Sequence, residues 1–351
     1  VQPMGVSYNS YLILDEKIAV MDSVDARAAD EWLAKLAHEL DGRRPDYLVI
    51  SHMEPDHSGS ILRLAERYPE MQLVGNAKTF AMLRQFFGAK APTDDRLLEV
   101  GEGETLPLGA HTLHFMLAPM VHWPEVMVAY EETEKLLFSA DAFGRFGALS
   151  RTAAAPWAPQ ARRYYYNIVG KYGAQVQALL KKAAALEIET ICPLHGPVLT
   201  GGALAEALRL YDLWSRWQSE APEEILLAHA SIHGNTARAA ELLKQKLEAK
   251  GARVTLCDLT TTEVSYAVAN AFYCGKLVLA CSTYDGGLFP PMEEFLSHLQ
   301  AKGFRDRSVG LMENGSWAPA AARLMRAKLE EMKDLRVCGT VVSLRSALGP
   351  A

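Results

Sequence analysis

A short segment after a predicted buried strand carries four side chains that can bind metal. The strand Tyr47–Ser51 is followed by His52, Glu54, Asp56 and His57 within six residues. A turn that only caps the next helix does not need two imidazoles and two carboxylates. A loop can aim such side chains in several directions, and their alternating spacing suits two pairs of ligands for two metals. This segment therefore predicts a metal site.

Three further candidate ligands occupy similar places in the chain. His122 lies just before a predicted strand, Asp141 and His195 each follow one, and Gly or Pro residues flank all three. Each of them alone could be an ordinary hydrogen-bonded polar residue. Their shared placement at strand ends favours a single site. The full candidate set is four histidines and three carboxylates: His52, Glu54, Asp56, His57, His122, Asp141 and His195.

The ligand types narrow the choice of metal without fixing it. Imidazole with carboxylate is compatible with zinc, iron or manganese, and two metals that share these seven side chains, with one aspartate between them, form a dinuclear site. The five cysteines are scattered and form no CxxC pair, which argues against a disulfide framework or a thiolate-ligated cluster. The residues alone leave both a zinc hydrolase and a redox iron site open.

The sequence around these ligands resembles the metallo-β-lactamase superfamily. The matching stretches are His52-Met-Glu-Pro-Asp-His-Ser-Gly-Ser60, Pro119-Met-Val-His-Trp-Pro124, Phe138-Ser-Ala-Asp-Ala-Phe-Gly144 and Pro193-Leu-His-Gly-Pro197. Hydrolases of this superfamily usually carry histidine at the place of Glu54. The glutamate variant resembles the flavodiiron proteins, whose site holds two irons.

This resemblance implies a role for each candidate ligand. One iron would be bound by His52, Glu54 and His122. The other would be bound by Asp56, His57 and His195, and Asp141 would bridge the two metals. The residues with an implied catalytic role are Glu54, Asp141 and His195.

A second candidate site lies in the other half of the chain. The predicted strand Ile225–His229 runs into a polar loop and then a helix, and a helix N-terminus with free N–H groups binds anions. The chain has neither GxxxxGK[ST] nor GxGxxG, so a Walker-type or dinucleotide site is disfavoured. The same residues could simply cap the helix. The loop residues are Ser231, Ile232, His233, Gly234, Asn235 and Thr236.

Two further loops at predicted strand ends strengthen the case for a ligand in this half. Doubly wound sheets bind ligands at the carboxyl ends of their strands, and both loops combine an aromatic residue with glycines. The first contains Ser282, Thr283, Tyr284, Asp285, Gly286 and Gly287, and the second Asn314, Gly315, Ser316 and Trp317. Together the three loops favour FMN, and this half resembles flavodoxin. Cys281-Ser-Thr283 and Asn314-Gly-Ser-Trp317 depart from the usual family sequences.

Two halves with different patterning are expected to position these residues. Residues 1–218 mix short strands and helices irregularly, in an α+β manner, and the resemblance implies a metallo-β-lactamase-like αββα sandwich. Residues 225–351 alternate strands and helices, which predicts an α/β, doubly wound, five-stranded parallel sheet like that of flavodoxin. The polar, proline-containing segment 219–224 is predicted to be a linker.

The composition is that of an ordinary globular protein. The chain has 351 residues, and its 36 basic and 42 acidic residues give a formal net charge of -6. This balance argues against nucleic-acid binding, and the chain has no run of about 18 apolar residues to span a membrane. With its scattered cysteines and no secretion signal at its N-terminus, we expect a cytoplasmic protein.

The resemblance implies a flavin-coupled diiron reductase. It would reduce O2 to water, NO to N2O, or both, with electrons from a separate donor such as rubredoxin or a reduced flavin-type cofactor. A head-to-tail homodimer or a dimer of dimers is also implied. The alternatives are a zinc-dependent hydrolase fused to a flavodoxin-like module, and an electron-transfer flavoprotein. Two interpretations remain open for a group of aromatic residues: they line the substrate pocket, or they belong to the core. These residues are Trp123, Phe143 and Tyr164–Tyr166.

Overall fold

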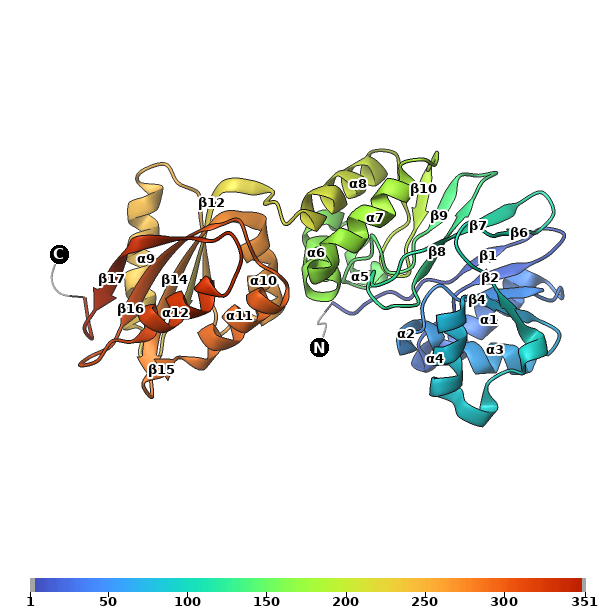
Figure 1. Ribbon diagram of the computed structural model, residues 1–351, viewed down its shortest axis with the longest axis horizontal. Helices are drawn as coiled ribbons and strands as arrows, with labels where there is room; N and C mark the ends of the chain where they lie inside the picture. Colours follow the sequence, from blue (N-terminus) through green and yellow to red (C-terminus); the bar gives the residue numbers. More distant parts are fainter. Residues whose placement is uncertain (1–3, 349–351) are drawn as a thin grey trace. The chain divides into compact units, whose positions relative to one another are not determined.

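The computed structural model describes residues 4–348. The first three residues of the predicted domain 1–218 and the last three of the predicted domain 225–351 therefore lie outside the described part. The chain divides into two compact units (Figure 1). One contains the residues up to Tyr165 together with Ala174–Asp212. The other contains Tyr166–Gly173 and the chain from Leu213 onward.

The first unit is built on two facing sheets. The first sheet has the order β1-β2-β3-β4-β5 and is parallel except for the β1–β2 pair. Its strands are β1 (Tyr11–Ile13), β2 (Ala19–Met21), β3 (Tyr47–Val49), β4 (Gln72–Gly75) and β5 (Leu97–Glu99). The second sheet has the order β11-β10-β9-β8-β7-β6, and only its β9–β10 pair is parallel. Its strands are β6 (Thr105–Pro107), β7 (Thr112–Leu117), β8 (Met127–Glu131), β9 (Leu136–Phe138), β10 (Thr190–Cys192) and β11 (Leu199–Thr200).

Alternating side chains place two cores on the two faces of the first sheet. Met21, Val49 and Val74 pack between the sheets, whereas Val20 and Leu48 pack toward the helices on the outer face. Helices of the second half of this unit lie beside the other sheet (Figure 1), and the predicted αββα sandwich is confirmed. The helices are α1 (Ala29–Leu40), α2 (Pro55–Ser58), α3 (Ile61–Arg67), α4 (Ala77–Phe87), α5 (Leu149–Thr152), α6 (Trp157–Tyr164), α7 (Gly173–Ala183) and α8 (Gly201–Ser215).

The second unit is a doubly wound sheet. Its order is β13-β12-β14-β16-β17, all parallel, and the short strand β15 adds an antiparallel hairpin to β14. The strands are β12 (Ala221–Ala230), β13 (Val254–Asp258), β14 (Cys274–Tyr284), β15 (Gly287–Leu288), β16 (Ser308–Asn314) and β17 (Arg336–Leu344). Helix α9 lies behind the sheet in Figure 1, and three helices lie on the viewer's side. These helices are α9 (Asn235–Glu248), α10 (Val264–Tyr273), α11 (Pro290–Ala301) and α12 (Ala321–Glu330).

One local prediction differs from the structure. The segment 219–224, predicted to be a linker, overlaps the start of β12, because Ala221 already pairs with Cys274. Gly275 permits this: a Cβ there would lie 2.2 Å from the Pro222 carbonyl oxygen. The sequence also predicts that residues 162–186 are mostly helical, and the structure divides them into segments, with a π turn at Tyr165–Val169 and a 3-10 turn at Gly170–Tyr172 between α6 and α7.

Within residues 4–348, no helix is both long enough and apolar enough to cross a membrane. In the same part of the chain, four of the five cysteines are buried, Cys338 is exposed, and all five are free thiols.

Candidate functional site

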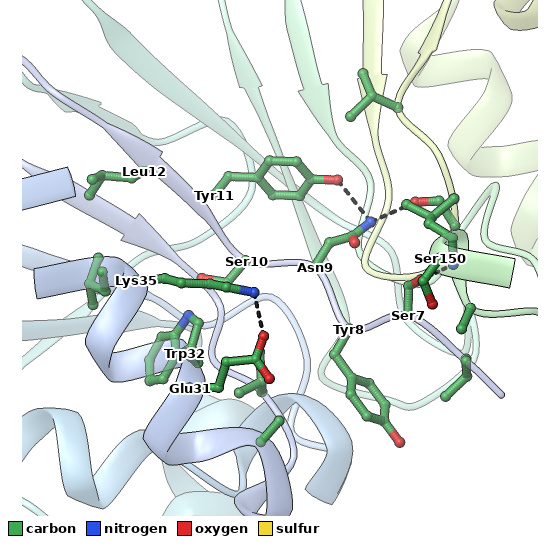
Figure 2. A pocket seen from close by; sticks show the side chains of 18 of the residues that line it. Ser7, Tyr8, Asn9, Ser10, Tyr11, Leu12, Glu31, Trp32, Lys35 and Ser150 are labelled. Atoms are coloured by element: carbon green, nitrogen blue, oxygen red, sulfur yellow. Dashed lines mark hydrogen bonds and ion pairs between the residues drawn. The ribbon is translucent and has the colours of Figure 1, made fainter. Parts of the chain in front are cut away.

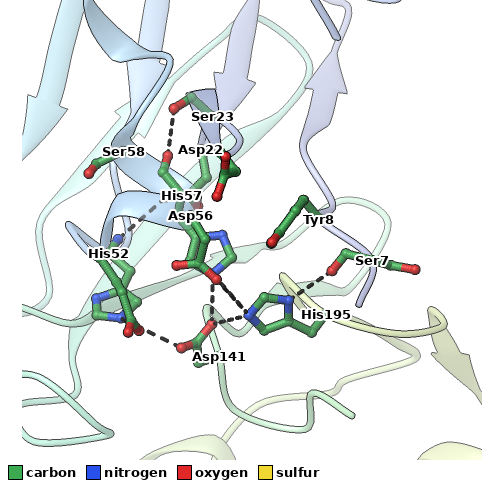
Figure 3. Close-up of polar contacts among 12 residues, drawn as sticks. Ser7, Tyr8, Asp22, Ser23, His52, Asp56, His57, Ser58, Asp141 and His195 are labelled. Atoms are coloured by element: carbon green, nitrogen blue, oxygen red, sulfur yellow. Dashed lines mark hydrogen bonds and ion pairs between the residues drawn. The ribbon is translucent and has the colours of Figure 1, made fainter. Parts of the chain in front are cut away.

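The predicted ligands come together beside the ends of β3, β9 and β10 of the first unit. Figure 3 shows five of them, His52, Asp56, His57, Asp141 and His195. Val49, Phe138 and Cys192 are the last residues of β3, β9 and β10, and all three belong to the core between the sheets. His52, Asp141 and His195 each follow three residues later. The packed core therefore fixes the starting points of the three loops that carry these ligands.

The segment that carries the other ligands is only partly a loop. Glu54 is the N-cap of α2, and Pro55 is the first residue of this helix, a position that suits the fixed φ of proline. Asp56 and His57 lie within this single helical turn. His122 comes from the loop between β7 and β8. All seven predicted ligands are thus brought to one place.

The seven side chains form two groups of donor atoms. One group consists of His52, Glu54, His122 and Asp141, and the other of Asp56, His57 and His195. Within each group, the potential ligand atoms lie within 4.8 Å of one another. His52, His57, Asp141 and His195 are buried.

Asp141 faces both groups at once. Its Oδ2 lies 3.0 Å from His122 Nε2 and 3.5 Å from His52 Nε2. Its Oδ1 lies 3.2 Å from His57 Nε2 and 3.5 Å from His195 Nε2. One carboxylate with an oxygen toward each group is the arrangement that a bridge between two metals requires.

The remaining carboxylates complete the two groups. Glu54 Oε2 lies 3.1 Å from His122 Nε2 and 3.3 Å from His52 Nε2. Asp56 Oδ2 lies 3.4 Å from His195 Nε2 and 3.5 Å from His57 Nε2. The Nε2 atoms of His57 and His195 lie only 3.1 Å apart. Nitrogen and oxygen donors converge in each group, so the residues fit metal ions.

Groups behind the ligands orient two of the imidazoles. His52 Nδ1–H donates to Glu125 Oε1 at 2.7 Å, and His195 Nδ1–H donates to the Ser7 carbonyl at 2.8 Å. Such bonds turn Nε2 of each ring toward the metal position. Buried Asp22 accepts from the Ser51 backbone N–H at 2.7 Å and so holds the start of the loop.

Sequence reasoning did not single out Asp22, Glu125 or the Ser7 carbonyl. Asp22 directly follows β2, and Glu125 lies three residues after His122, so acidic residues near strand ends and ligands are a usable signal. A main-chain carbonyl leaves no trace in the residue types. The Ser7 carbonyl can be recognised as a partner of His195 only in the fold, which brings the N-terminal segment beside the loop that follows β10.

That N-terminal segment also forms a wall of a separate cavity of about 680 Å³ in the first unit (Figure 2). Asn9 Nδ2 donates to the carbonyls of Pro193 and Gly196, both at 2.8 Å, and so ties the segment to the loop that carries His195. On the opposite side of the cavity, Lys35 pairs with Glu31 on α1 (Figure 2).

Without a metal, the surrounding carboxylates favour the protonated form of two of the ligand imidazoles, those of His52 and His122. Burial lowers the pKa of His52, but hydrogen bonds to Glu125 and Glu54 and the charge of Asp141 outweigh it and raise this pKa to about 10. Burial also lowers the pKa of His122, but hydrogen bonds to Asp141 and Glu54 outweigh this effect and raise the pKa to about 9. Burial opposes ionisation of Glu54, but His122 and His52 lower its pKa to about 2. Glu54 is therefore charged, and protons occupy the imidazoles of His52 and His122, which a metal needs.

These directions predict proton release when metal binds. At pH 7 the raised pKa values keep His52 and His122 protonated, so binding should release about two protons, and affinity should fall as the pH falls. Calorimetric titration of metal-free protein in two buffers of different protonation enthalpy measures this release. Binding heats that do not depend on the buffer would contradict it.

The loop that carries Asp141 depends on a glycine. Ala140 and Phe143 have φ values of 50° and 66°, and a Cβ on Gly144 would lie 3.0 Å from the Asp141 carbonyl oxygen and 3.3 Å from His195 Cβ. The backbone is thus held in a costly conformation close to two ligands. Glycine at position 144 leaves the space that this arrangement needs.

We predict that Gly144→Ala displaces this loop. The added methyl should cost about 1–3 kcal/mol of stability through overpacking and reduce the bound metal. Thermal unfolding and metal analysis measure both effects. Gly202→Ala in α8 is the control, because a Cβ there meets nothing within 4 Å. Metal content equal to wild type in Gly144→Ala would contradict the prediction.

The three polar loops of the second unit line one cavity of about 470 Å³. It opens where β12, β14 and β16 end. Most of the predicted residues line it, and Ala318 and Ser346 are additions that sequence reasoning missed. The lining residues are Ser231, Ile232, His233, Asn235, Thr236, Ser282, Thr283, Asp285, Gly286, Asn314, Gly315, Ser316, Trp317, Ala318 and Ser346.

One end of this cavity suits a phosphate group. Gly234 is the N-cap of α9 and provides no side-chain cap, so the first N–H groups of this 14-residue helix face the loop. The buried Ser231 Oγ has no hydrogen-bond partner among the described residues. Thr236 Oγ1 and Ser282 Oγ lie 2.9 Å apart and join two of the loops. Hydroxyls and N–H groups, without a lysine, are groups that could hold an anion here.

Some of the predicted residues have structural tasks. Thr283 Oγ1 accepts from the N–H of Ala320 at 3.0 Å, at the start of α12. The Asn314 side chain exchanges two hydrogen bonds with the Ser346 backbone, at 2.8 and 3.0 Å. Gly234, Tyr284 and Gly287 are not among the lining residues. Gly234 is the N-cap of α9, and Tyr284 and Gly287 pair in the β14–β15 hairpin. Trp317 is 89% exposed at the rim.

Comparisons with known proteins agree with this architecture. A family model described as "ODP family beta lactamase" matches residues 6–196, more than half of the chain. The flavo-diiron protein FprA2 of Clostridium acetobutylicum is 27% identical over 94% of this chain and 84% of its own length. The chain belongs to the flavodiiron protein family.

Two further relatives of this flavodiiron chain are named for different substrates, one for nitric oxide and one for oxygen. A nitric oxide reductase of Moorella thermoacetica is 27% identical over 94% of this chain and 83% of its own. The structure of rubredoxin oxygen:oxidoreductase from Desulfovibrio gigas superposes with a TM-score of 0.91 at 26% identity, over 99% of this chain and 88% of the other.

Proposed function

We propose that this flavodiiron protein is an oxidoreductase that reduces O2 to water, NO to N2O, or both, at a two-iron centre with electrons passed through FMN. The observation that carries the proposal is Asp141, which directs one oxygen to each of two matched donor groups. Relatives named for oxygen and for nitric oxide support both substrates. The zinc hydrolase alternative is less favoured because Glu54 stands where hydrolases usually carry histidine.

The donor set fits iron. Four imidazoles and three carboxylates, with no thiolate, are ligands that non-haem iron accepts. His52, Glu54 and His122 would hold one iron, Asp56, His57 and His195 the other, and Asp141 both. When bound, two such metals supply electrons and open coordination positions to a small diatomic substrate. Glu54, Asp141 and His195 are the residues we propose as catalytic.

Aromatic side chains surround the centre in different ways. Buried Tyr164 lies with its ring 5.5 Å from that of His195, and burial together with the charge of Asp141 raises its pKa well above the usual value. Its phenol therefore keeps its proton and can donate a hydrogen bond toward the site. Trp123 packs edge-on against His52 at 5.2 Å and shields it from water. Phe143 packs against Tyr211 at 4.2 Å, which supports the core alternative for this residue.

The cavity of the second unit fits FMN. The free Ser231 hydroxyl and the start of α9 suit the phosphate, and the loops that contain Asp285, Gly315 and Trp317 suit a flat ring. Residues 1–218 would then bind iron and residues 225–351 would bind FMN. Metal and flavin analysis of purified protein tests this: about two irons and one FMN per chain support the proposal. FMN without stoichiometric metal would favour the electron-transfer alternative.

The partners follow from the same proposal. Electrons would come from a separate donor, rubredoxin or a reduced flavin-type cofactor, and the name of the similar structure, rubredoxin oxygen:oxidoreductase, supports rubredoxin. A head-to-tail homodimer or a dimer of dimers in the cytoplasm is the proposed form of the protein.

We predict that Glu54→His abolishes O2 and NO reduction. The change replaces a negative ligand with a neutral one and creates the ligand pattern of the hydrolases. Oxygen and nitric oxide consumption, measured with equal amounts of bound metal, tests the role of this carboxylate. Retained reduction at the wild-type rate would count heavily against it.

We predict that Thr236→Val weakens FMN binding. Valine keeps the shape of this buried residue but removes the hydroxyl that faces Ser282, and the loss of a hydrogen bond to a charged group costs about 1.5–3 kcal/mol. Flavin fluorescence during titration of flavin-free protein measures the affinity.

Riboflavin lacks the phosphate, so its binding distinguishes the loss of a phosphate contact from a general disturbance of the cavity. Its affinity should be unchanged in Thr236→Val. Thr260→Val is a control outside the cavity, where the hydroxyl bonds Asp258 on the surface. A wild-type affinity of Thr236→Val for FMN would refute the assigned phosphate contact.

A further inference from the structure

The two donor groups are equal in their direct ligands. The first contains two imidazoles and Glu54, the second contains two imidazoles and Asp56, and each receives one oxygen of Asp141. Charge and ligand count therefore do not distinguish the two metal positions. Any difference between them must come from the groups behind the ligands.

Those supporting groups are unequal. Behind the first group, His52 Nδ1–H donates to the carboxylate of Glu125 at 2.7 Å. Behind the second, His195 Nδ1–H donates to a neutral main-chain carbonyl, that of Ser7, at 2.8 Å. His57 Nδ1 is buried and has no hydrogen-bond partner among residues 4–348. Among residues 4–348, a supporting carboxylate thus hydrogen-bonds to Nδ1 of a ligand imidazole only in the first group.

Glu125 is held so that it cannot turn away from His52. Its side chain is fully buried, and Oε1 also accepts from the Met53 backbone N–H at 2.8 Å. Its main-chain carbonyl accepts from Asn76 Nδ2 at 2.7 Å, and Asn76 in turn caps the start of α4. Oε2 is buried and has no hydrogen-bond partner in the described part of the chain. The charge is therefore poorly screened and directed at one imidazole.

Asp22 is the other buried carboxylate near the centre. Its Oδ1 accepts from two backbone N–H groups, that of Ser51 at 2.7 Å and, more weakly, that of His52 at 3.4 Å. It therefore positions the loop, and its charge acts on His57 and on His52, one imidazole of each group, without a hydrogen bond to either ring. The direct hydrogen bond from His52 to a buried carboxylate remains the difference that Glu125 creates.

We propose that Glu125 is a positioning residue that makes the two metal positions unequal. The position at His52, Glu54 and His122 fills first and holds its metal more tightly, and the position at Asp56, His57 and His195 fills second. A carboxylate behind an imidazole fixes its tautomer and makes Nε2 a stronger donor, and its charge acts strongly in a buried site. The inference rests on the proposed two-metal centre and adds an order of loading to it.

Metal titration of the full chain tests the order without relying on activity. Metal-free protein is titrated anaerobically with Fe²⁺ by calorimetry, and with Co²⁺ as an optical probe of ligand geometry. Wild type should show two separate steps. Asp56→Asn should weaken the second step and His122→Asn the first, which assigns each step to its position.

Glu125→Gln tests the origin of the inequality. Glutamine keeps the size of the side chain and an oxygen that can accept from His52, but it removes the charge. The affinity of the first step should fall about 10–100-fold while the second step stays unchanged, so that the two steps converge. Glu132→Gln is the matched control, because Glu132 accepts from His114 Nε2 at 2.8 Å on the exposed surface.

The possible outcomes separate the inference from the proposed function. Two steps that merge only in Glu125→Gln support it. One unresolved step in wild type, or an equal loss of both affinities in Glu125→Gln, overturns it while leaving the two-metal centre in place. Failure of wild type to bind two metals overturns the proposed function as well. If Glu125→Gln does not fold, as judged by circular dichroism, the wild-type, Asp56→Asn and His122→Asn titrations still decide the order of loading.

Discussion

A single buried carboxylate has to serve two groups of imidazoles at once, and the rest of the metal centre is arranged around that requirement. Asp141 can do so only if its two oxygens point in opposite directions and its main chain stays fixed. Ala140 and Phe143 adopt positive φ values to turn the chain, and the Tyr211 hydroxyl accepts from the Phe143 N–H at 2.6 Å. A change in this loop moves one ligand atom in each group, so the two metal positions are coupled through it.

The sandwich supplies the fixed starting points for this arrangement. β9 and β10 are parallel neighbours with Phe138 opposite Cys192, so Asp141 and His195 leave the sheet at the same level. Val49 of the other sheet packs in the same core, and His52 leaves β3 with the same three-residue spacing. The distances among the ligands are therefore set by strand register and by sheet packing, both of which rest on burial of apolar side chains.

The parts of the structure that were predictable from the sequence are those in which residue type alone carries the information. Histidines and carboxylates gathered at strand ends are visible as letters, and so is the alternation of strands and helices in the second unit. The Ser7 carbonyl was not predictable, because a main-chain group has no residue signature. Short strands such as β4 and β5 were missed, since three or four residues are too few to establish a period.

In other places the residue type suggested only part of what the residue does. Pro222 indicated a linker, yet Gly275 leaves room for it beside the sheet. Thr283 indicated a ligand contact, and it lines the cavity, but its hydroxyl also holds the first turn of α12. In both cases the decisive factor is a neighbour far away in the sequence. Local composition describes what a residue can do, and the tertiary contact selects which of these tasks it performs.

The two candidate sites suit ligands of opposite charge, a metal cation in one and a phosphate in the other. Both are formed by loops at the carboxyl ends of parallel strands. The flavin cavity offers an anion neutral hydroxyls and the N–H groups at the start of α9. The metal centre concentrates carboxylates in a buried place, and the raised pKa values of His52 and His122 show that protons balance them in the metal-free protein. Metal ions replace these protons. Loading of the centre is therefore an exchange of one set of cations for another.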